Sequence, residues 1–413
     1  MPAHELPAEF FERLATSALA QDPYAELERL QVDPAPRLRS GEVVLGRHVD
    51  VEGVLRSPVF LKPTLPPVPL QSVRTMLRMF LLLNAPDHLR LRRAVAPLFI
   101  PAAVSARREL VEVEVDRLLH GRTELEVVRD LAYPLPLQLI CTWLGVRPGD
   151  EQRIESWGKI LLANLDGPVP LSPRDAIRYA AAVARRRSRP LATVVAIRAM
   201  GAYARDLLRG YGDGEFLVVL RAAVADGTMS ENEAVATWAL LVIAGYETTA
   251  NLIGNTIHLL LAHPEQLAAV QDDGSLVGAA VEESLRFESP VPMGVRVPSQ
   301  PITVAGRDLG AGDPVFVVIA SANRDPTVFT DPDRFDITRD ATPNIAFGHG
   351  AHVCIGAQLA RTEATAAVAA IVGRHPVRTG GPPRWRPTFA TRGLEALPVR
   401  LSFSDGPVRR GTP

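Results

Sequence analysis

Apolar residues recur three and four positions apart along most of this chain, a spacing that is typical of helices packed on a core. Short apolar runs between turn-forming residues predict few strands. No repeat, low-complexity linker or shift in composition divides the sequence. We therefore predict a single domain over residues 1–413, mainly α with small β-sheets, with short flexible ends at about 1–20 and 404–413.

The individual elements follow from the same pattern. Three strands are predicted, at Glu42–Leu45, Ile302–Ala305 and Pro314–Ile319. Helices are predicted at His88–Phe99, Val104–His120, Ala176–Ala184, Leu191–Leu208, Ala234–Leu261, Leu276–Phe287 and Gly356–Val372.

One of these helices is unusually long. Ser230 followed by Glu233 fits a capping box ahead of it, and Pro264 lies just beyond its last apolar turn. With these ends it has about 32 residues and a length of about 48 Å, enough to cross a whole globule. Because it is apolar on most sides, we expect it at the centre of the fold.

The middle of this helix carries the polar segment AGYETT, Ala244–Thr249. A carboxylate and hydroxyls inside an apolar helix cost free energy unless they are paired or hydrated. One interpretation is structural, with the hydroxyls bonded to carbonyls four residues earlier and Glu247 at a surface. The other is functional, with Glu247 and Thr248 delivering protons to a buried reaction site. The residues alone leave both open.

The charge and cysteine content of the chain exclude several classes of protein. Forty-five Lys and Arg residues balance 46 Asp and Glu residues, so no overall field favours nucleic acid or an anionic membrane. The two cysteines make no disulfide framework, and the N-terminus lacks a signal-peptide pattern. Glu247 interrupts the longest apolar stretch before it reaches the roughly 18 residues of a bilayer span. We expect a cytoplasmic protein without nucleic acid or membrane partners, with Cys141 in its core.

The stretch FGHGAHVCIG, Phe347–Gly356, holds the other cysteine. A dinucleotide-binding loop would need a third glycine where Val353 stands. A zinc site is open to His349, His352 and Cys354, although structural zinc usually takes four ligands. A third interpretation is a loop that brings the Cys354 thiolate to haem iron. The glycines permit close approach to a flat cofactor, and the following helix start stabilises a thiolate.

With these motifs the sequence resembles the cytochromes P-450, haem-thiolate monooxygenases, and especially their soluble bacterial members. The resemblance runs in the family's order from about Pro23 to Arg400. AGYETT resembles the oxygen-activating segment, and Glu283 with Arg286 in EESLR resembles the family's ExxR pair. The haem-binding signature is matched by Phe347, Gly348, Gly350, His352, Cys354 and Gly356.

The resemblance implies a triangular helical prism around a buried haem b, with Cys354 as the iron ligand. It also implies that Ala244 faces the haem and that His88, Arg92 and Arg296 contact the haem propionates. His88 and Arg92 are four residues apart, so they share one helical face, although an exposed basic helix would show the same spacing.

For Glu283 and Arg286, the resemblance implies a buried structural pair that braces the ANRDP segment and the loop before Cys354. Their spacing by itself equally allows a surface ion pair worth under about 1 kcal/mol.

The resemblance further implies the reaction. Glu247 and Thr248 would be catalytic, and one oxygen atom of O2 would enter a hydrophobic substrate. The sequence has no flavin or nicotinamide motif and no cysteine cluster, so we expect a ferredoxin and a ferredoxin reductase to supply electrons to a monomer. A haem-thiolate sensor without turnover is the rival from another class.

The substrate is the least determined feature. We predict a roomy apolar pocket and the hydroxylation or epoxidation of a bulky secondary metabolite such as a polyketide, as in antibiotic biosynthesis. The alternative is a catabolic hydroxylase of a small terpenoid. In the resemblance, the pocket is lined by Leu240, Ile243, Ala244, Pro292, Met293, Gly294, Val295, Ala390 and Thr391.

Overall fold

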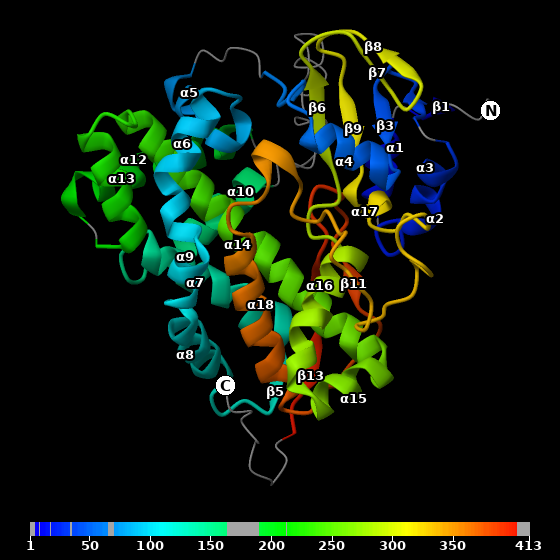
Figure 1. Cartoon of the computed structure of the whole chain (residues 1–413). Coiled ribbons are helices and arrows are strands. Elements are labelled where there is room, and N and C mark those ends of the chain that lie inside the picture. The colour runs from blue at the N-terminus through cyan, green and yellow to red at the C-terminus, as the bar shows by residue number, and fades with distance from the viewer. Residues whose placement is uncertain are drawn as a thin grey trace.

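The structure, a computed structural model, describes residues 5–7, 9–16, 18–33, 35–64, 70–162, 190–211 and 213–402. Helices fill most of the molecule (Figure 1). The strands of the largest sheet lie near the N-terminus, while β5 (Glu124–Glu126) and β13 (Pro398–Arg400) lie at the opposite end of the molecule. The prediction of a mainly α chain with small sheets is confirmed. The helix predicted at 176–184 and the flexible end at 404–413 lie outside the described residues.

The α-helices are connected by short helical turns at Phe80–Leu82, Ala96–Phe99, Val128–Ala132, Leu207–Tyr211, Gly274–Leu276 and Gly350–His352. Their bounds are α1 Phe10–Leu14, α2 Tyr24–Leu27, α3 Arg29–Val32, α4 His48–Arg56, α5 Gln71–Met76, α6 Asp87–Val95, α7 Pro101–Ser105, α8 Arg108–Leu119, α9 Pro134–Trp143, α10 Glu151–Leu162, α12 Pro190–Asp206, α13 Glu215–Ala225, α14 Glu231–Ala262, α15 Pro264–Asp272, α16 Val277–Phe287, α17 Ile319–Ala322 and α18 Ala357–Val372.

The largest described sheet has six strands in the order β1-β2-β3-β9-β6-β4, and smaller sheets pair β10-β13-β5, β11-β12 and β7-β8. In the centre of the large sheet, β9 pairs in parallel with β3 and antiparallel with β6. The strand bounds are β1 Glu5–Leu6, β2 Arg37–Leu38, β3 Val43–Leu45, β4 Phe60–Leu61, β5 Glu124–Glu126, β6 Gly294–Pro298, β7 Ile302–Val304, β8 Arg307–Leu309, β9 Val315–Val317, β10 Val377–Arg378, β11 Arg384–Trp385, β12 Leu394–Ala396 and β13 Pro398–Arg400.

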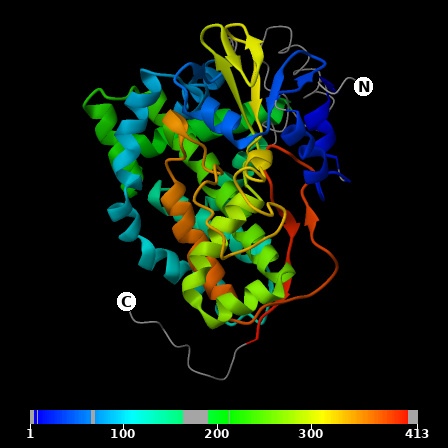
Figure 2. The same cartoon turned by 45° about the vertical axis from the view of Figure 1, so that its right-hand side comes forward.

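The long helix α14 is the axis of the fold. It has 32 residues, and the predicted capping box is present, with the Ser230 hydroxyl accepting from the Glu233 N–H. Figures 1 and 2 both show α14 crossing the middle of the helical region beside α18. Most of its residues are buried, and it packs against α9, α18, α12 and α16. Its central position is therefore confirmed.

Several predicted boundaries differ from the structure for local reasons. The helix predicted at His88–Phe99 ends at Val95 and continues as a tighter turn, because Pro97 cannot donate the next backbone hydrogen bond. The helix predicted at Val104–His120 is divided into α7 and α8. The last predicted strand stops at Val317, and α17 begins at Ile319.

The N-terminal segment also differs from its prediction. Of the expected flexible end at about 1–20, the described part contains β1, paired with β2, and the helix α1. Phe10 and Leu14, one helical turn apart, are 2% and 1% exposed and pack into an apolar cluster with Phe316. This burial anchors the segment.

Among the described residues, none of the helices has both the length and the apolar character of a membrane span.

Cys141 lies in α9, inside the main apolar cluster, as predicted. Its side chain is 2% exposed, and burial raises the pKa of its thiol to about 12. It therefore stays a protonated, apolar core residue.

A fully buried ion pair joins α16 to the long loop that follows α17. Glu283 and Arg286 are both 0% exposed, and two hydrogen bonds of 2.7 and 2.8 Å connect them. Arg286 also donates to the carbonyls of Asn323 and Pro332, at 3.0 and 2.8 Å. Glu283 accepts from the Asp336 N–H at 3.0 Å. The pair therefore braces the ANRDP segment and the loop beyond it.

We predict that Glu283→Gln lowers the free energy of unfolding by about 3–5 kcal/mol, because the Arg286 charge loses its buried partner. The matched control is Glu282→Gln on the same helix. Glu282 pairs with Arg361, but both side chains are about one third exposed, at 31% and 34%. The control should therefore cost less than about 1 kcal/mol. Denaturant titration of both variants measures the difference, and equal losses would contradict the role of the buried pair.

Candidate active site

The loop Phe347–Gly356 is shaped by its glycines and leads directly into α18. Gly348 and Gly350 both have φ of +69°, a conformation that other residues rarely adopt. A Cβ at Gly350 would lie 2.4 Å from the carbonyl oxygen of Leu55, at the end of α4. The Cys354 N–H donates to the Phe347 carbonyl at 2.9 Å and closes the loop. Glycine is therefore required for the loop to pack where it does.

The Cys354 thiol points into space that solvent can reach, although many protein atoms surround it. This surrounding protein raises the pKa of the thiol, while a hydrogen bond from the Gly356 N–H and the charges of Arg92 and Arg361 lower it. Burial is the largest of these effects, so the pKa of the thiol is raised overall. An accessible sulfur of this kind is a suitable ligand for a soft or borderline metal.

Beside this loop lies a group of basic side chains that we call the cationic cluster: the cations Lys62, Arg92 and Arg296 and the imidazoles of His88 and His352, whose pKa values are lowered. The rings of His88 and His352 are 4.0 Å apart. His88 comes from α6 and Arg296 from β6, so elements far apart in the sequence converge here. The predicted propionate residues His88, Arg92 and Arg296 are therefore brought together, next to His352 of the cysteine loop.

The cationic cluster has no opposite charge among the described residues, where no carboxylate forms an ion pair with Lys62, Arg92 or Arg296. Burial, followed by neighbouring positive charge, lowers the pKa of His352 to about 3 and that of Lys62 to about 7. Within the described part of the chain, buried His88 Nε2 and His352 Nδ1 lack hydrogen-bond partners. Donors and charge of this kind fit a bound dicarboxylate, as the two propionates of haem b provide.

Lys62 is a member of the cluster that the sequence analysis missed. It follows β4, whose Leu61 pairs with Val297 of β6, so Lys62 comes next to Arg296. Asn84 holds the Lys62 backbone with two hydrogen bonds of 2.8 and 3.0 Å. The position of Lys62 depends on the pairing of β4 with β6, and a strand of two residues is too short to be predicted from the sequence.

The AGYETT segment, Ala244–Thr249, carries exposed and buried residues on different sides of α14. Ala244 is exposed although it lies in the middle of a mostly buried helix. The Thr248 hydroxyl donates to the Ala244 carbonyl at 3.1 Å, and Thr249 donates to Gly245 at 3.4 Å. The back-bonding of the structural interpretation is therefore present. Its surface placement of Glu247 is wrong, because that residue is 5% exposed.

Glu247 is held by residues from the C-terminal part of the chain. Arg386 donates to its Oε1 at 2.7 Å, and the Thr391 hydroxyl donates to the same oxygen at 3.2 Å. Arg386 also donates to the Tyr133 hydroxyl at 2.7 Å and to Asn251 Oδ1 at 2.6 Å. Arg386 could not be identified from the sequence, since it lies 139 residues from Glu247 and no motif relates the two.

A cavity of about 950 Å³ reaches this network between α9, α10, α14 and the segment around Arg386. Glu247, Arg386 and the predicted substrate residues Ala390 and Thr391 line it. The other predicted substrate residues do not line this cavity. Among them, Leu240 and Ile243 are buried on α14, while Pro292, Met293, Gly294 and Val295 lead into or form the start of β6.

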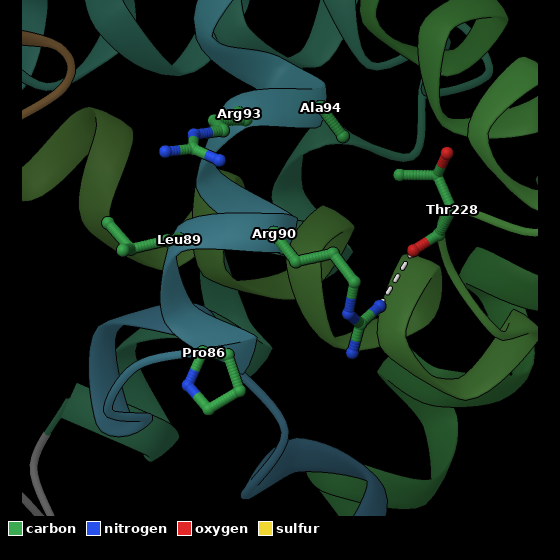
Figure 3. A pocket seen from close by; sticks show the side chains of 6 residues that line it. All are labelled: Pro86, Leu89, Arg90, Arg93, Ala94 and Thr228. Atoms are coloured by element: carbon green, nitrogen blue, oxygen red, sulfur yellow. Dashed lines mark hydrogen bonds between the residues drawn. The ribbon is translucent and has the colours of Figure 1, made fainter.

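A second pocket, of about 540 Å³, lies on the outer face of α6. Figure 3 shows Leu89, Arg90 and Arg93 around it, with Arg90 donating to the Thr228 carbonyl at 2.7 Å. Neither Cys354 nor Glu247 lines this pocket, so it is separate from the predicted chemistry.

The zinc interpretation needs His349, His352 and Cys354 to meet at one point. In the parts of the chain that the structure describes, no group of three or more His, Cys, Asp and Glu side chains is arranged to hold a metal ion. The arrangement instead presents Cys354 as a single thiol ligand, next to the cationic cluster.

Comparisons with known proteins identify the family of this chain. The family model described as Cytochrome P-450 matches residues 212–385. Cytochrome P-450 107B1 of Saccharopolyspora erythraea is 36% identical, over 93% of this chain and 96% of its own. The cytochrome P-450 monooxygenase PikC of Streptomyces venezuelae is 37% identical, over 92% and 91%.

A solved structure extends the likeness to the fold. The bacillaene polyketide synthase cytochrome P-450 PksS of Bacillus subtilis 168 superposes with a TM-score of 0.81 at 27% identity, covering 94% of this chain and 99% of that one. Together with the sequence relatives, this establishes the fold that the resemblance implied. The chain belongs to the cytochrome P-450 family of haem b-binding monooxygenases.

Proposed function

We propose that this chain is a haem-thiolate monooxygenase that inserts one oxygen atom of O2 into a bulky hydrophobic small molecule, in the tailoring of a secondary metabolite such as a polyketide. The observation that carries the haem site is the accessible Cys354 thiol beside a cationic cluster that has no carboxylate partner among the described residues. The proposal for the substrate class draws on a relative, since PksS is named as the cytochrome P-450 of the bacillaene polyketide synthase.

In this proposal Cys354 holds the haem iron, and His88, Arg92, Arg296 and His352 hold the propionates. Phe347, Gly348, Gly356 and Ala244 form the walls of the cofactor site. When bound, haem b supplies the reductive activation of O2 at a thiolate-ligated iron. The protein orients the substrate, excludes water and delivers protons.

Proton delivery is assigned to two neighbouring residues of α14. The Thr248 hydroxyl lies one helical turn from Ala244 and donates to its carbonyl, so its oxygen can accept a further hydrogen bond on the cofactor side. The Glu247 carboxylate is buried yet lines a cavity, which suits a group that takes up protons from water. Leu240, Ile243 and the Pro292–Val295 segment supply the apolar contacts to substrate.

The remaining partners follow from the sequence. We infer that a ferredoxin and its reductase deliver the electrons, because this sequence has only two cysteines and no flavin or nicotinamide motif. We infer a cytoplasmic monomer, in keeping with its low cysteine content and balanced charge.

The thiolate ligand has a spectral signature. We predict that the reduced protein with carbon monoxide shows the red-shifted Soret band of thiolate ligation, and that Cys354→His abolishes it. Cys141→Ala is the control, because Cys141 is buried in α9 with its thiol pKa raised to about 12. A Cys354→His variant that kept the band would overturn the assignment of the ligand.

The proton-delivery role is tested at Thr248. We predict that Thr248→Ala consumes reducing equivalents while hydrogen peroxide accumulates in place of product, with a loss of product formation of about 10² or more. The adjacent Thr249 makes the same type of back-bond to the helix but is buried on another face, so Thr249→Ala should retain coupling. Equal peroxide yields from both variants would count against a specific role of the Thr248 hydroxyl.

The substrate class is tested by a difference-spectral titration of the haem. We predict that a macrolactone displaces iron-bound water and shifts the spectrum to high spin. A monoterpene of the size of camphor should give a smaller shift or none, because it fills a roomy pocket poorly. A shift seen only with the monoterpene would favour the catabolic alternative. If none of these ligands is converted to product when electron-transfer partners are supplied, the result would favour a haem-thiolate sensor without turnover.

A further inference from the structure

Two cations act on the Cys354 sulfur, and they have different partners. The charges of Arg92 and Arg361 both lower the pKa of the thiol. Arg92 belongs to the cationic cluster, where bound propionates would neutralise it. Arg361 lies on α18 and pairs instead with the carboxylate of Glu282 on α16. The partner of this second cation therefore belongs to the protein and not to the cofactor.

The guanidinium of Arg361 lies over the ring of Phe347, the first residue of the cysteine loop. Its central carbon is 4.5 Å from the centre of that ring, within the range of a cation–π contact. The Phe347 carbonyl accepts from the Cys354 N–H at 2.9 Å. Arg361 is therefore held next to the residue that closes the loop on the cysteine.

Glu282 determines the direction in which Arg361 points. Its carboxylate accepts two hydrogen bonds from the guanidinium, one from Nε and one from Nη2, the latter at 3.0 Å. Such a two-point contact fixes the plane of an arginine as well as its position. The side chain of Asn344, just before the cysteine loop, also donates to Glu282 at 3.4 Å. Glu282 thus joins α16 and α18 to the chain that enters the loop.

Stability alone does not explain this pair. The side chains of Arg361 and Glu282 are 34% and 31% exposed, and an ion pair with that access to water contributes less than about 1 kcal/mol. Glu363 is the other ionisable residue of α18. It is 2% exposed, and burial raises its pKa to about 8, so at neutral pH it is protonated and uncharged. Arg361 is therefore the one charge that α18 places near the cysteine loop.

A charge near the thiolate changes how readily the bound cofactor accepts an electron. Reduction adds one negative charge beside the sulfur. A nearby cation stabilises that charge and weakens electron donation from the thiolate, while a nearby anion does the opposite. Arg361 and Glu282 therefore act in opposite directions, and the effect of Arg361 reaches the Cys354 sulfur.

We propose that Arg361, held by Glu282 and by the ring of Phe347, sets the reduction potential of the bound haem from the thiolate side. It acts through Cys354 and not on the substrate, so it is a positioning residue. In the step concerned, a reduced ferredoxin gives up one electron and the ferric cofactor becomes ferrous. This inference rests on the proposed role of Cys354 as the iron ligand.

The inference is tested by spectroelectrochemical titration of the haem-loaded protein, without substrate or partner protein. Arg361→Met removes the cation, so the ratio of reduced to oxidised haem at a fixed potential should fall about three-fold or more, or about 30 mV for one electron. Glu282→Gln removes the anion and should raise that ratio. The double variant should lie between the two. Arg361→Lys retains the charge and should stay close to the unmodified protein.

The matched control is an arginine–glutamate pair on another helix. Arg117 and Glu114 of α8 are also joined by two hydrogen bonds. Arg117→Met and Glu114→Gln should leave the potential unchanged, because neither charge is among those that shift the pKa of Cys354. The Soret band recorded before each titration reports the spin state, which has to match between variants because a change of spin also moves the potential.

The sign of the shift separates an effect of charge from a general disturbance of the loop. Opposite shifts in Arg361→Met and Glu282→Gln support the inference. If both variants leave the potential unchanged, or move it in the same direction, the role of Arg361 is overturned and that of Cys354 stands.

The carbon monoxide spectrum identifies failure of the proposed function. If the unmodified protein lacks the red-shifted band, the assignment of Cys354 as ligand is overturned, and the inference with it. Should Arg361→Met alone lose that band, Glu282→Gln decides the question: a higher potential supports the inference, and an unchanged one overturns it.

Discussion

The buried pair of Glu283 and Arg286 is the interaction on which the position of the cysteine loop depends. Two charges without solvent contact are tolerated only when the ions and the surrounding backbone satisfy each other. Arg286 binds the Asn323 carbonyl, and the Asn323 side chain in turn accepts from the Ile345 N–H at 2.8 Å, two residues before Phe347. The pair thus fixes the segment that enters the loop, while α18 fixes the segment that leaves it.

The cationic cluster, unlike the buried pair, lacks an opposite charge among the described residues. At Glu283 and Arg286 opposite charges meet, whereas Lys62, His88, Arg92, Arg296 and His352 gather without a carboxylate among the described residues. Like charges that lower one another's pKa destabilise a folded chain by itself. An anionic ligand bound to the cluster would remove that cost and stabilise the fold.

Helix α14 links the two sides of the active site. Its apolar length places it in the core, and its polar residues face in different directions because each position turns by about 100°. Thr248 belongs to the side where Ala244 is exposed, and Glu247 belongs to the side of Arg386 and the cavity. One helix therefore carries a polar residue on each side, Thr248 toward the exposed Ala244 and Glu247 toward the cavity.

The sequence by itself determined the long capped helix, the glycine-shaped cysteine loop, the core position of Cys141 and the family, because these depend on local spacing and on compact motifs. Only the tertiary structure decided that Lys62 lies beside His88 and Arg296. It also decided that Arg386 binds Glu247. Finally, it placed Ala390 and Thr391 on the wall of the cavity that Glu247 lines, and not Leu240 or Ile243. These relations join residues from distant elements through two- and three-residue strands. Their pairing carries no periodic signal in the sequence and is set by packing against α14 and the sheet.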